Sequence, residues 1–146
     1  MEIDHRRARS VGYLANWAAR LFARALERRL ASGNLGPMPV YFALMDGAAL
    51  SQKELTRRAA VEQPTMANTL ARMERDALIV RTPDPSDGRS ALVSLTPLGH
   101  SRAEAAFATS MRVNEVAFAA LTPDERAQFI DMLKRVIEQL EADGGE

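Results

Sequence analysis

Apolar residues recur at helical spacing near the start of the chain. Val11, Leu14 and Ala18 begin a series whose members lie three or four positions apart, as on one face of an amphipathic helix. The pattern predicts a helix from about Ser10 to Leu30. Glycine and proline residues between positions 33 and 39 end it.

Three shorter helices are predicted in the middle of the chain. The first covers Val40 to Met45 and ends near Asp46-Gly47, where glycine tolerates the left-handed conformation. The second runs from Ser51 to about Ala60. It begins with Ser51-Gln52-Lys53-Glu54, a capping-box pattern in which the serine and glutamate side chains each accept a backbone N–H bond. The third begins at Gln63-Pro64, with proline in the first turn, and continues to Asp76.

Strands and two longer helices follow. The apolar, β-branched segments Leu78 to Thr82 and Ala91 to Leu95 predict a β-hairpin, with residues 83–90 as a long polar tip. Thr96-Pro97 begins a helix that extends to about Ala120. Thr122-Pro123-Asp124-Glu125 combines a threonine cap with a capping-box glutamate and begins the last helix. The apolar stripe of that helix contains Phe129, Met132, Leu133, Val136, Ile137 and Leu140.

This order of elements predicts a mainly α fold with a small β-hairpin wing. Two short helices, a tight turn and a hairpin form a winged helix-turn-helix domain, and the remaining helices form a helical dimerisation lobe. We expect an N-terminal dimerisation helix in residues 1–32, the DNA-binding lobe in 33–96 and the C-terminal dimerisation helices in 97–146. The apolar stripes of the terminal helices are too extensive for a monomer, which predicts an obligate homodimer.

The helix that begins at Gln63 has two distinct faces. At about 100° per residue, Met66, Leu70, Met73 and Ala77 share one narrow sector, which we expect to face the core. A separate sector carries short polar side chains and one arginine, which suit a helix that enters the major groove and contacts base edges and phosphates. The alternative is a polar face that is merely solvated. The residues of this second sector are Thr65, Asn68, Thr69 and Arg72.

The hairpin tip contains Asp87-Gly88-Arg89. An arginine at the tip of a wing can enter the adjacent minor groove, where narrow A·T-rich segments concentrate negative potential. Two alternatives remain open for this part of the wing. Arg89 is simply solvated, or Asp87 holds Arg89 or Arg81 in a structural ion pair.

Motifs distributed along the chain resemble those of the MarR family of bacterial transcriptional regulators. The resemblance spans essentially the whole chain, and the combination of a recognition helix, a D-x-R wing and an L-T-x-x-G helix start is specific. The residues that carry it are Gln63-Pro64-Thr65-Met66 through Leu70, Met73-Glu74-Arg75-Asp76, Leu78-Ile79-Val80-Arg81, Asp84-Pro85, Asp87, Arg89 and Leu95-Thr96 with Gly99.

The resemblance implies a homodimer that binds a pseudo-palindromic DNA operator and is released by a small aromatic or phenolic effector. It also implies that Ser51 and Gln52 lie near phosphates. Ala77 and Gly88 depart from the family pattern, which usually has a glycine and a basic residue there. By position, the candidate DNA-binding residues are Ser51, Gln52, Gln63, Pro64, Thr65, Asn68, Thr69, Arg72 and Arg89, with Asp87 and Arg81 as wing-structure residues.

A ligand cleft is implied between the dimerisation helices and the DNA-binding lobe. Aromatic and methionine side chains occur on the relevant elements, and Tyr13 and Trp17 could orient a ring through their polar groups. Burial in an ordinary core is the alternative, above all for Phe107 and Met111. The candidate ligand-binding residues are Tyr13, Trp17, Met38, Tyr41, Phe107 and Met111.

Composition excludes several chemistries. The chain has no cysteine and two histidines, His5 and His100, so thiol chemistry is impossible and we expect neither a metal site nor a cofactor. It has no nucleotide-binding or nucleophile-elbow motif, and its carboxylates are scattered, so we do not expect an enzyme. Without a long apolar run or a signal sequence, we expect a cytoplasmic protein with no membrane partner.

The 19 basic and 19 acidic residues give zero net charge, which alone argues against a strongly basic DNA-binding protein. The charges are unevenly distributed, however. Residues 1–32 contain 7 basic and 3 acidic groups, whereas residues 97–146 contain 5 and 9. Much of the charge can therefore cancel within the dimerisation lobe, so that operator affinity depends on a few well-placed contacts.

We therefore expect a sequence-specific DNA-binding transcriptional regulator, most simply a repressor. The alternative is a helical dimeric module that binds ligands or partners without recognising a DNA sequence. Binding to the upstream region of the protein's own gene distinguishes the two.

Overall fold

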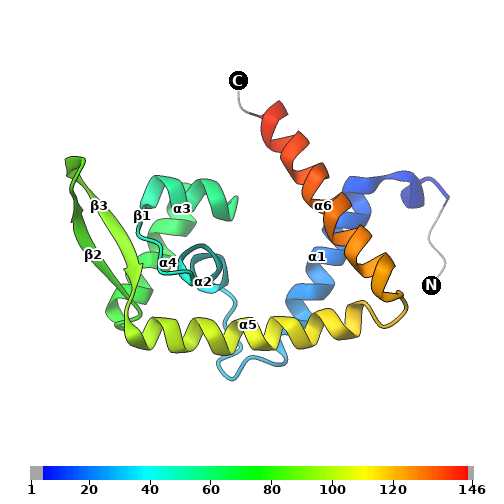
Figure 1. Ribbon diagram of the computed structural model, residues 1–146, viewed down its shortest axis with the longest axis horizontal. Helices are drawn as coiled ribbons and strands as arrows, with labels where there is room; N and C mark the ends of the chain where they lie inside the picture. The colour runs from blue at the N-terminus through cyan, green and yellow to red at the C-terminus, as the bar shows by residue number, and fades with distance from the viewer. Residues whose placement is uncertain (1–4, 145–146) are drawn as a thin grey trace. The chain divides into compact units, whose positions relative to one another are not determined.

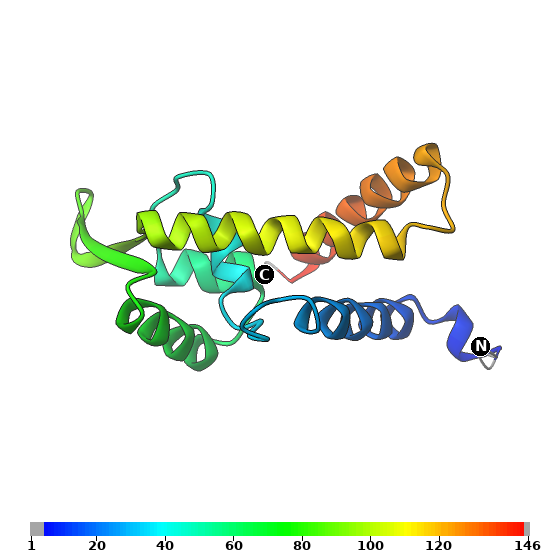
Figure 2. The same cartoon turned by 90° about the horizontal axis from the view of Figure 1, so that it is seen from below.

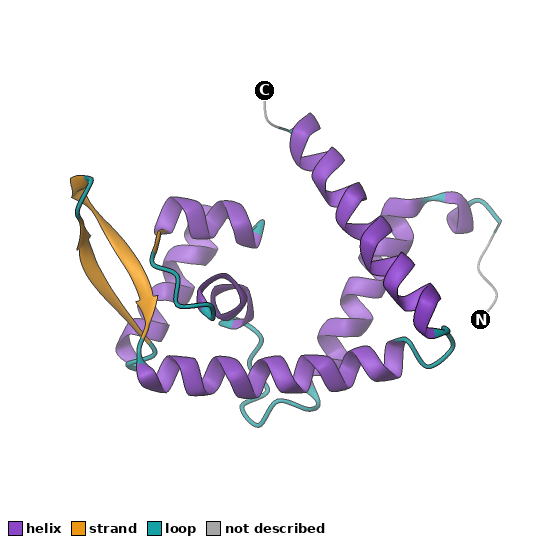
Figure 3. Cartoon of the chain, viewed as in Figure 1, coloured by secondary structure: helices purple, strands orange, loops and turns teal. Residues whose placement is uncertain are grey.

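The computed structural model describes residues 5–144 and confirms a mainly helical fold with a small antiparallel sheet (Figures 1 and 3). The chain divides into two compact units, Met1–Ser110 and Met111–Glu146, and helix α5 continues from the first into the second. In chain order the elements are η1 (Arg7–Arg9), α1 (Val11–Glu27), α2 (Met38–Leu44), β1 (Leu50–Ser51), α3 (Gln52–Ala59), α4 (Gln63–Arg75), β2 (Ile79–Asp84), β3 (Asp87–Leu95), α5 (Pro97–Ala117) and α6 (Pro123–Asp143).

Helix α1 begins where the sequence predicts but ends earlier. The Ser10 hydroxyl caps it by accepting a hydrogen bond from the backbone N–H of Tyr13 (3.2 Å). The prediction of helix up to Leu30 is wrong by three residues. Beyond Glu27 the chain forms a turn, in which the Arg29 N–H donates to the carbonyl of Leu26, three residues back.

The sheet has three strands in the order β1-β3-β2, all antiparallel. Strand β1 was not predicted, because two residues are too few to show an alternating pattern. The predicted long wing tip is also wrong, since β2 and β3 extend until Asp84 pairs with Asp87. The Asp84 carboxylate stabilises the tight turn by accepting hydrogen bonds from the backbone N–H and hydroxyl of Ser86 (2.9 and 2.7 Å).

The core of the first unit lies among α2, α3, α4, the sheet and the N-terminal part of α5. Figures 1 and 2 show α3, α4 and the β2–β3 hairpin grouped around this core. Met66, Leu70 and Met73 are buried, as predicted. The expectation for Ala77 is wrong, because α4 ends at Arg75 and leaves Ala77 exposed in the following turn. The other large, fully buried side chains are those of Val40, Leu44, Leu55, Ile79 and Val93.

The second unit contains the end of α5 and all of α6. The predicted capping box forms at the start of α6, where Thr122 N–H donates to Glu125 Oε2 (2.8 Å) and Glu125 N–H donates to Thr122 Oγ1 (3.3 Å). Helix α6 has no buried residue, and its apolar stripe is exposed from Phe129 to Leu140. Among the helices of residues 5–144, none has both the length and the hydropathy needed to cross a bilayer.

Hydrogen bonds join the start of α5 to the residues that precede strand β2 of the wing. The Thr96 hydroxyl donates to the carbonyl of Ala77 (2.6 Å) and accepts a hydrogen bond from the Gly99 N–H (3.0 Å). The Thr96 N–H donates to the carbonyl of Leu78 (3.0 Å). A Cβ at Gly99 would overlap that same Leu78 carbonyl oxygen. The L-T-x-x-G pattern therefore encodes a close approach between two backbone segments.

Substituting Gly99→Ala should lower the free energy of unfolding by about 2–3 kcal/mol, because the added methyl group forces rigid backbone segments apart. Urea unfolding at one fixed protein concentration measures this. Gly12→Ala is the matched control, since a Cβ at Gly12 meets no atom within 4 Å. Equal stability of the two variants would contradict the close approach.

Candidate nucleic-acid interface

Helix α4 presents one face to the core and the opposite face to solvent. Pro64 occupies its first turn, where a backbone N–H has no intrahelical acceptor, so the missing N–H of proline leaves no helical hydrogen bond unmade. Burial of Met66 and the two other apolar residues of its inner face fixes the rotation of the helix about its axis. Thr65, Asn68 and Arg72 are consequently exposed, and Thr69 is half-buried at the edge of the inner face.

Arg75 was missed as a candidate. Measured from the buried residues at about 100° per residue, Asn68 and Arg75 point most directly away from the core, whereas Thr65 and Thr69 lie on one flank. The Arg75 side chain is 71% exposed, and its Nε donates to Asp76 Oδ1 (3.2 Å). The helical wheel could have identified it, had the outer sector been centred opposite the core.

Helix α3 begins beside the sheet, and its N-cap differs in part from the prediction. The Ser51 hydroxyl accepts a hydrogen bond from the Glu54 N–H (3.2 Å), as expected. The prediction that the Glu54 carboxylate accepts a hydrogen bond from the Ser51 backbone N–H is wrong. This carboxylate pairs instead with Arg57 (2.7 Å) and Arg58 (2.8 Å). Hydrogen bonds from these two guanidinium groups lower the pKa of Glu54 to about 2. The first turn of α3 therefore carries a fully ionised carboxylate at neutral pH.

Arg81 connects the wing to both helices of the helix-turn-helix. Its Nε donates to Glu74 Oε2 on α4 (2.6 Å), and its Nη1 donates to Gln52 Oε1 on α3 (3.5 Å). The proposed pairing of Arg81 with Asp87 is therefore not observed. Arg81 instead helps to fix the angle between the wing and α4.

Arg89 lies on the exposed end of strand β3. The Asp87 carboxylate accepts a hydrogen bond from the backbone N–H of Arg89 (3.0 Å). Within residues 5–144 no carboxylate forms an ion pair with its guanidinium group. The side chain is thus available to a partner, and Gly88 beside it contributes no charge.

Ala77 makes the turn between α4 and β2 in the left-handed conformation, with φ of 57°. The Leu78 N–H donates to the carbonyl of Met73 (2.8 Å), which closes the end of α4. L-residues with a Cβ are disfavoured in this region. The turn that the family usually makes with glycine is therefore made here with strain.

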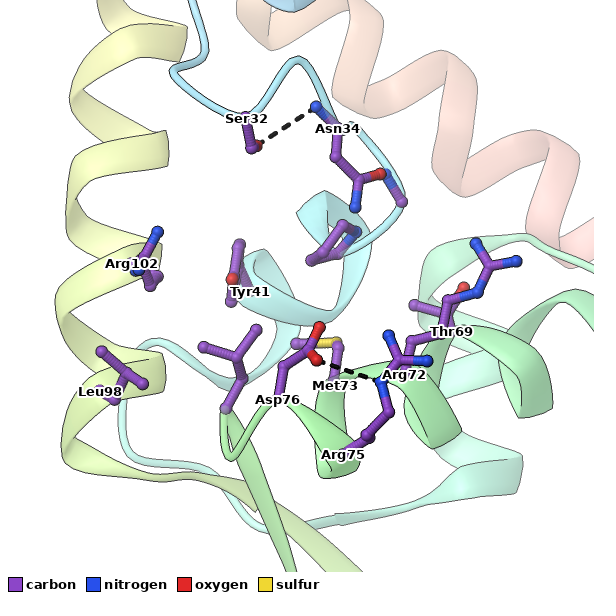
Figure 4. A pocket seen from close by; sticks show the side chains of 13 residues that line it. Ser32, Asn34, Tyr41, Thr69, Arg72, Met73, Arg75, Asp76, Leu98 and Arg102 are labelled. Carbon is purple, nitrogen blue, oxygen red and sulfur yellow. Dashed lines mark hydrogen bonds and ion pairs between the residues drawn. The ribbon is translucent and has the colours of Figure 1, made fainter.

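A cleft of about 520 Å³ opens beside α4 (Figure 4). Thr69 and Arg72 line it from α4, Tyr41 lines it from α2, and Arg102 lines it from α5. The remaining lining residues are Ser32, Asn34, Gly36, Pro37, Met73, Arg75, Asp76, Leu78 and Leu98.

The six candidate ligand residues do not line one cleft. Tyr41 lines the cleft beside α4, and Met38 is buried in the core. Tyr13 and Trp17, with ring centroids 5.9 Å apart, line a pocket of about 240 Å³ on α1.

The last two candidates lie on α5. Phe107 is 37% exposed and contacts the ring of Phe42 edge-to-face, so it is not an ordinary core residue. Met111 lines a pocket of about 410 Å³ in the second unit. Residues 5–144 contain no group of three histidine or carboxylate side chains that could hold a metal ion.

Comparison with known proteins places these features in a family. A sequence profile described as MarR family matches residues 41–90. The transcriptional regulator HosA of Escherichia coli O111:H- is 30% identical over 95 residues, which cover 65% of this chain and 70% of HosA. The chain belongs to the MarR family. This family consists of transcriptional regulators, not enzymes.

Two further similarities extend beyond the matched profile. The HTH-type transcriptional repressor NicR of Pseudomonas putida is 30% identical over 102 residues, which cover 70% of this chain and 65% of NicR. The PcaV transcriptional regulator of Streptomyces coelicolor, solved in complex with its natural ligand, has a TM-score of 0.78 and 28% identity. That alignment covers 100% of this chain and 99% of PcaV. A transcriptional regulator with a bound ligand therefore shares this fold.

Replacing Ala77→Gly should raise the free energy of unfolding by about 1 kcal/mol, because glycine adopts positive φ without a Cβ clash. Ala71→Gly, on the exposed face of α4, is the matched control and should lower it by about 1 kcal/mol. Chemical denaturation of both variants measures the pair. Destabilisation of similar size in both would show that Ala77 carries no strain.

Proposed function

We propose that this MarR-family chain is a sequence-specific DNA-binding repressor that acts as a homodimer. Helix α4 of each subunit enters the major groove, and Arg89 of each wing reaches the neighbouring minor groove. A small ligand releases the protein from a pseudo-palindromic operator. In this proposal residues 33–96 bind DNA, and residues 1–32 with 97–146 supply the dimerisation lobe.

The exposed face of α4 is the observation that carries the proposal. Its short side chains allow close approach to the groove floor, and Asn68 can form two hydrogen bonds with an adenine edge. Arg72 can donate hydrogen bonds to guanine or to a phosphate, and Arg75 adds a second positive charge near the C-terminal end of the same face. Because Met66, Leu70 and Met73 are buried, the helix cannot turn this face inward without exposing its apolar side.

Phosphate contacts would come from the elements around α4. Ser51 and Gln52 lie half-buried at the start of α3, and Gln63 and Pro64 lie exposed at the start of α4. A helix N-terminus attracts phosphate through its free N–H groups and its dipole. These contacts would set the register of the protein on DNA, while α4 reads the sequence.

The terminal helices support a homodimer. Neither α1 nor α6 contains a buried residue, although each has an apolar stripe. Leu21 of α1 is 50% exposed, and Leu140 of α6 is 66% exposed. A second copy can cover such stripes, and the basic N-terminal segment complements the acidic C-terminal one. Dimerisation would place the two α4 helices in successive major grooves, about 34–36 Å apart.

Alanine substitutions on α4 test the assignment. Asn68→Ala and Arg72→Ala should each weaken binding to the operator by about 1–3 kcal/mol, with a smaller effect on random DNA. Gel-shift titrations against the upstream region of the protein's own gene and against a scrambled duplex measure both affinities at one salt concentration.

Lys134→Ala is the matched control, because it removes an exposed positive charge on α6 and should leave both affinities unchanged. Equal losses on the two duplexes would assign Asn68 and Arg72 to phosphate contacts. Absence of a selective shift by the unmodified chain would favour the alternative, a ligand-binding module that recognises no DNA sequence.

A further inference from the structure

We propose that Arg57 and Arg58 of α3 bind the phosphate backbone of DNA, and that the Glu54 carboxylate competes with the phosphates for these two arginines. Glu54 would thereby limit the part of the DNA affinity that does not depend on sequence. This competition rests on the proposed function, because it requires α4 to lie in the major groove.

The last turn of α3 lies next to the helix that is proposed to enter the groove. Helices α3 and α4 pack against each other, and only residues 60–62 separate them (Figure 1). The major groove is about 12 Å wide, so a helix inside it has a row of phosphates on either side. Arg57 and Arg58 belong to the last turn of α3, and their side chains are 62% and 47% exposed. Both guanidinium groups can therefore reach a phosphate beside the first turn of α4.

Glu54 occupies the donors that a phosphate would use. The Arg57 Nε and Nη2 atoms donate to Glu54 Oε2 and Oε1 (3.0 and 2.7 Å), which makes a bidentate pair. The Arg58 Nε donates to Oε1 of the same carboxylate (2.8 Å). Arginine binds carboxylate and phosphate groups through the same fork of N–H donors. A phosphate must therefore displace Glu54 to form these bonds.

Carboxylates pair with most of the basic residues in the DNA-binding lobe. Residues 33–96 contain seven basic side chains, and four of them form ion pairs with a carboxylate, namely Arg57, Arg58, Arg75 and Arg81. Within residues 5–144, no carboxylate forms an ion pair with the other three, which are Lys53, Arg72 and Arg89. Glu54 alone accounts for two of the four pairs. Removing its charge would raise the number of unpaired cations in the lobe from three to five.

The pairs of Glu54 can exchange with phosphate at little cost. They lie at the surface, and exposed ion pairs contribute little to folding stability, because water and salt screen them. A simpler role for Glu54 is to stabilise α3 through pairs with residues three and four positions later. Salt distinguishes the two roles, since only phosphate binding changes the number of counterions that the protein releases from DNA.

Binding of the full chain to a random-sequence duplex at several salt concentrations tests the competition, with fluorescence anisotropy as the measurement. Glu54→Gln should tighten binding by about tenfold at about 0.1 M salt, the gain from one additional phosphate contact. The slope of log affinity against log salt should steepen by about 0.9 for each phosphate gained. Glutamine keeps the size of the side chain and can complete the capping box, so the variant should fold.

Glu115→Gln is the matched control. Glu115 pairs with Arg126 in the second unit (3.3 Å), so this variant removes the same charge and releases an arginine outside residues 33–96. It should leave the affinity and the salt slope unchanged. A gain of similar size in both variants would assign the effect to net charge and overturn the proposal, as would unchanged binding by Glu54→Gln.

Removing the two arginines tests whether they are the groups that gain the phosphates. Arg57→Gln and Arg58→Gln, added together to Glu54→Gln, should cancel its gain. A gain that persists without these arginines would show that the carboxylate merely repels DNA, and would overturn the proposal. Glu54→Ala keeps a strong helix former in α3 and should show the same gain, so the competition can be tested even if Glu54→Gln does not fold.

A titration with operator DNA separates this competition from the proposed function. Phosphate contacts carry no sequence information, so Glu54→Gln should raise the affinities for operator and scrambled duplexes by similar factors. Selective operator binding by the unmodified chain, with no gain from Glu54→Gln, would overturn the competition alone. A gain on random duplexes without operator selectivity would support the competition and contradict the sequence-specific function.

Discussion

Burial of the apolar side of α4 is the constraint on which the rest of the structure depends. Met66, Leu70 and Met73 are each at most 1% exposed, and fully burying such side chains contributes about 1.5–3 kcal/mol each. Rotating the helix by even a quarter-turn would forfeit much of this free energy. The polar face is therefore held outward by the core, and the Glu74–Arg81 ion pair and the backbone contact at Gly99 hold the wing beside it.

Local signals explain which parts of the fold could be predicted from the sequence. The start of α1 at Ser10 and the capping box at Thr122 follow from residues within one turn of each other. The same S-x-x-E pattern at Ser51 forms only half a box, because Arg57 and Arg58 lie three and four residues after Glu54 and bind its carboxylate. The sequence spacing of Glu54 and these two arginines therefore also indicates the ion pairs that replace the second half of the capping box.

Contacts between distant segments explain what could not be predicted. Strand β1 exists because Leu50 pairs with Val93. Two residues are too few to show an alternating pattern, so the sequence does not predict this pairing. Arg81 bonds to residues 7 and 29 positions away, so its partner could not be chosen from the sequence. The candidate ligand residues are predicted from the helices on which they lie, but the direction of each side chain determines whether it lines a cleft. Tyr41 opens on the cleft, whereas Met38, on the same helix, is buried in the core.

The central claim is that two copies of α4, held at a fixed spacing, read DNA through their exposed polar faces. Selection of bound duplexes from a random pool by the full chain tests this claim most directly. The account predicts enrichment of a pseudo-palindrome whose half-site centres lie about 10–10.5 base pairs apart. A pool that stays unenriched, or that yields a single asymmetric half-site, would contradict it.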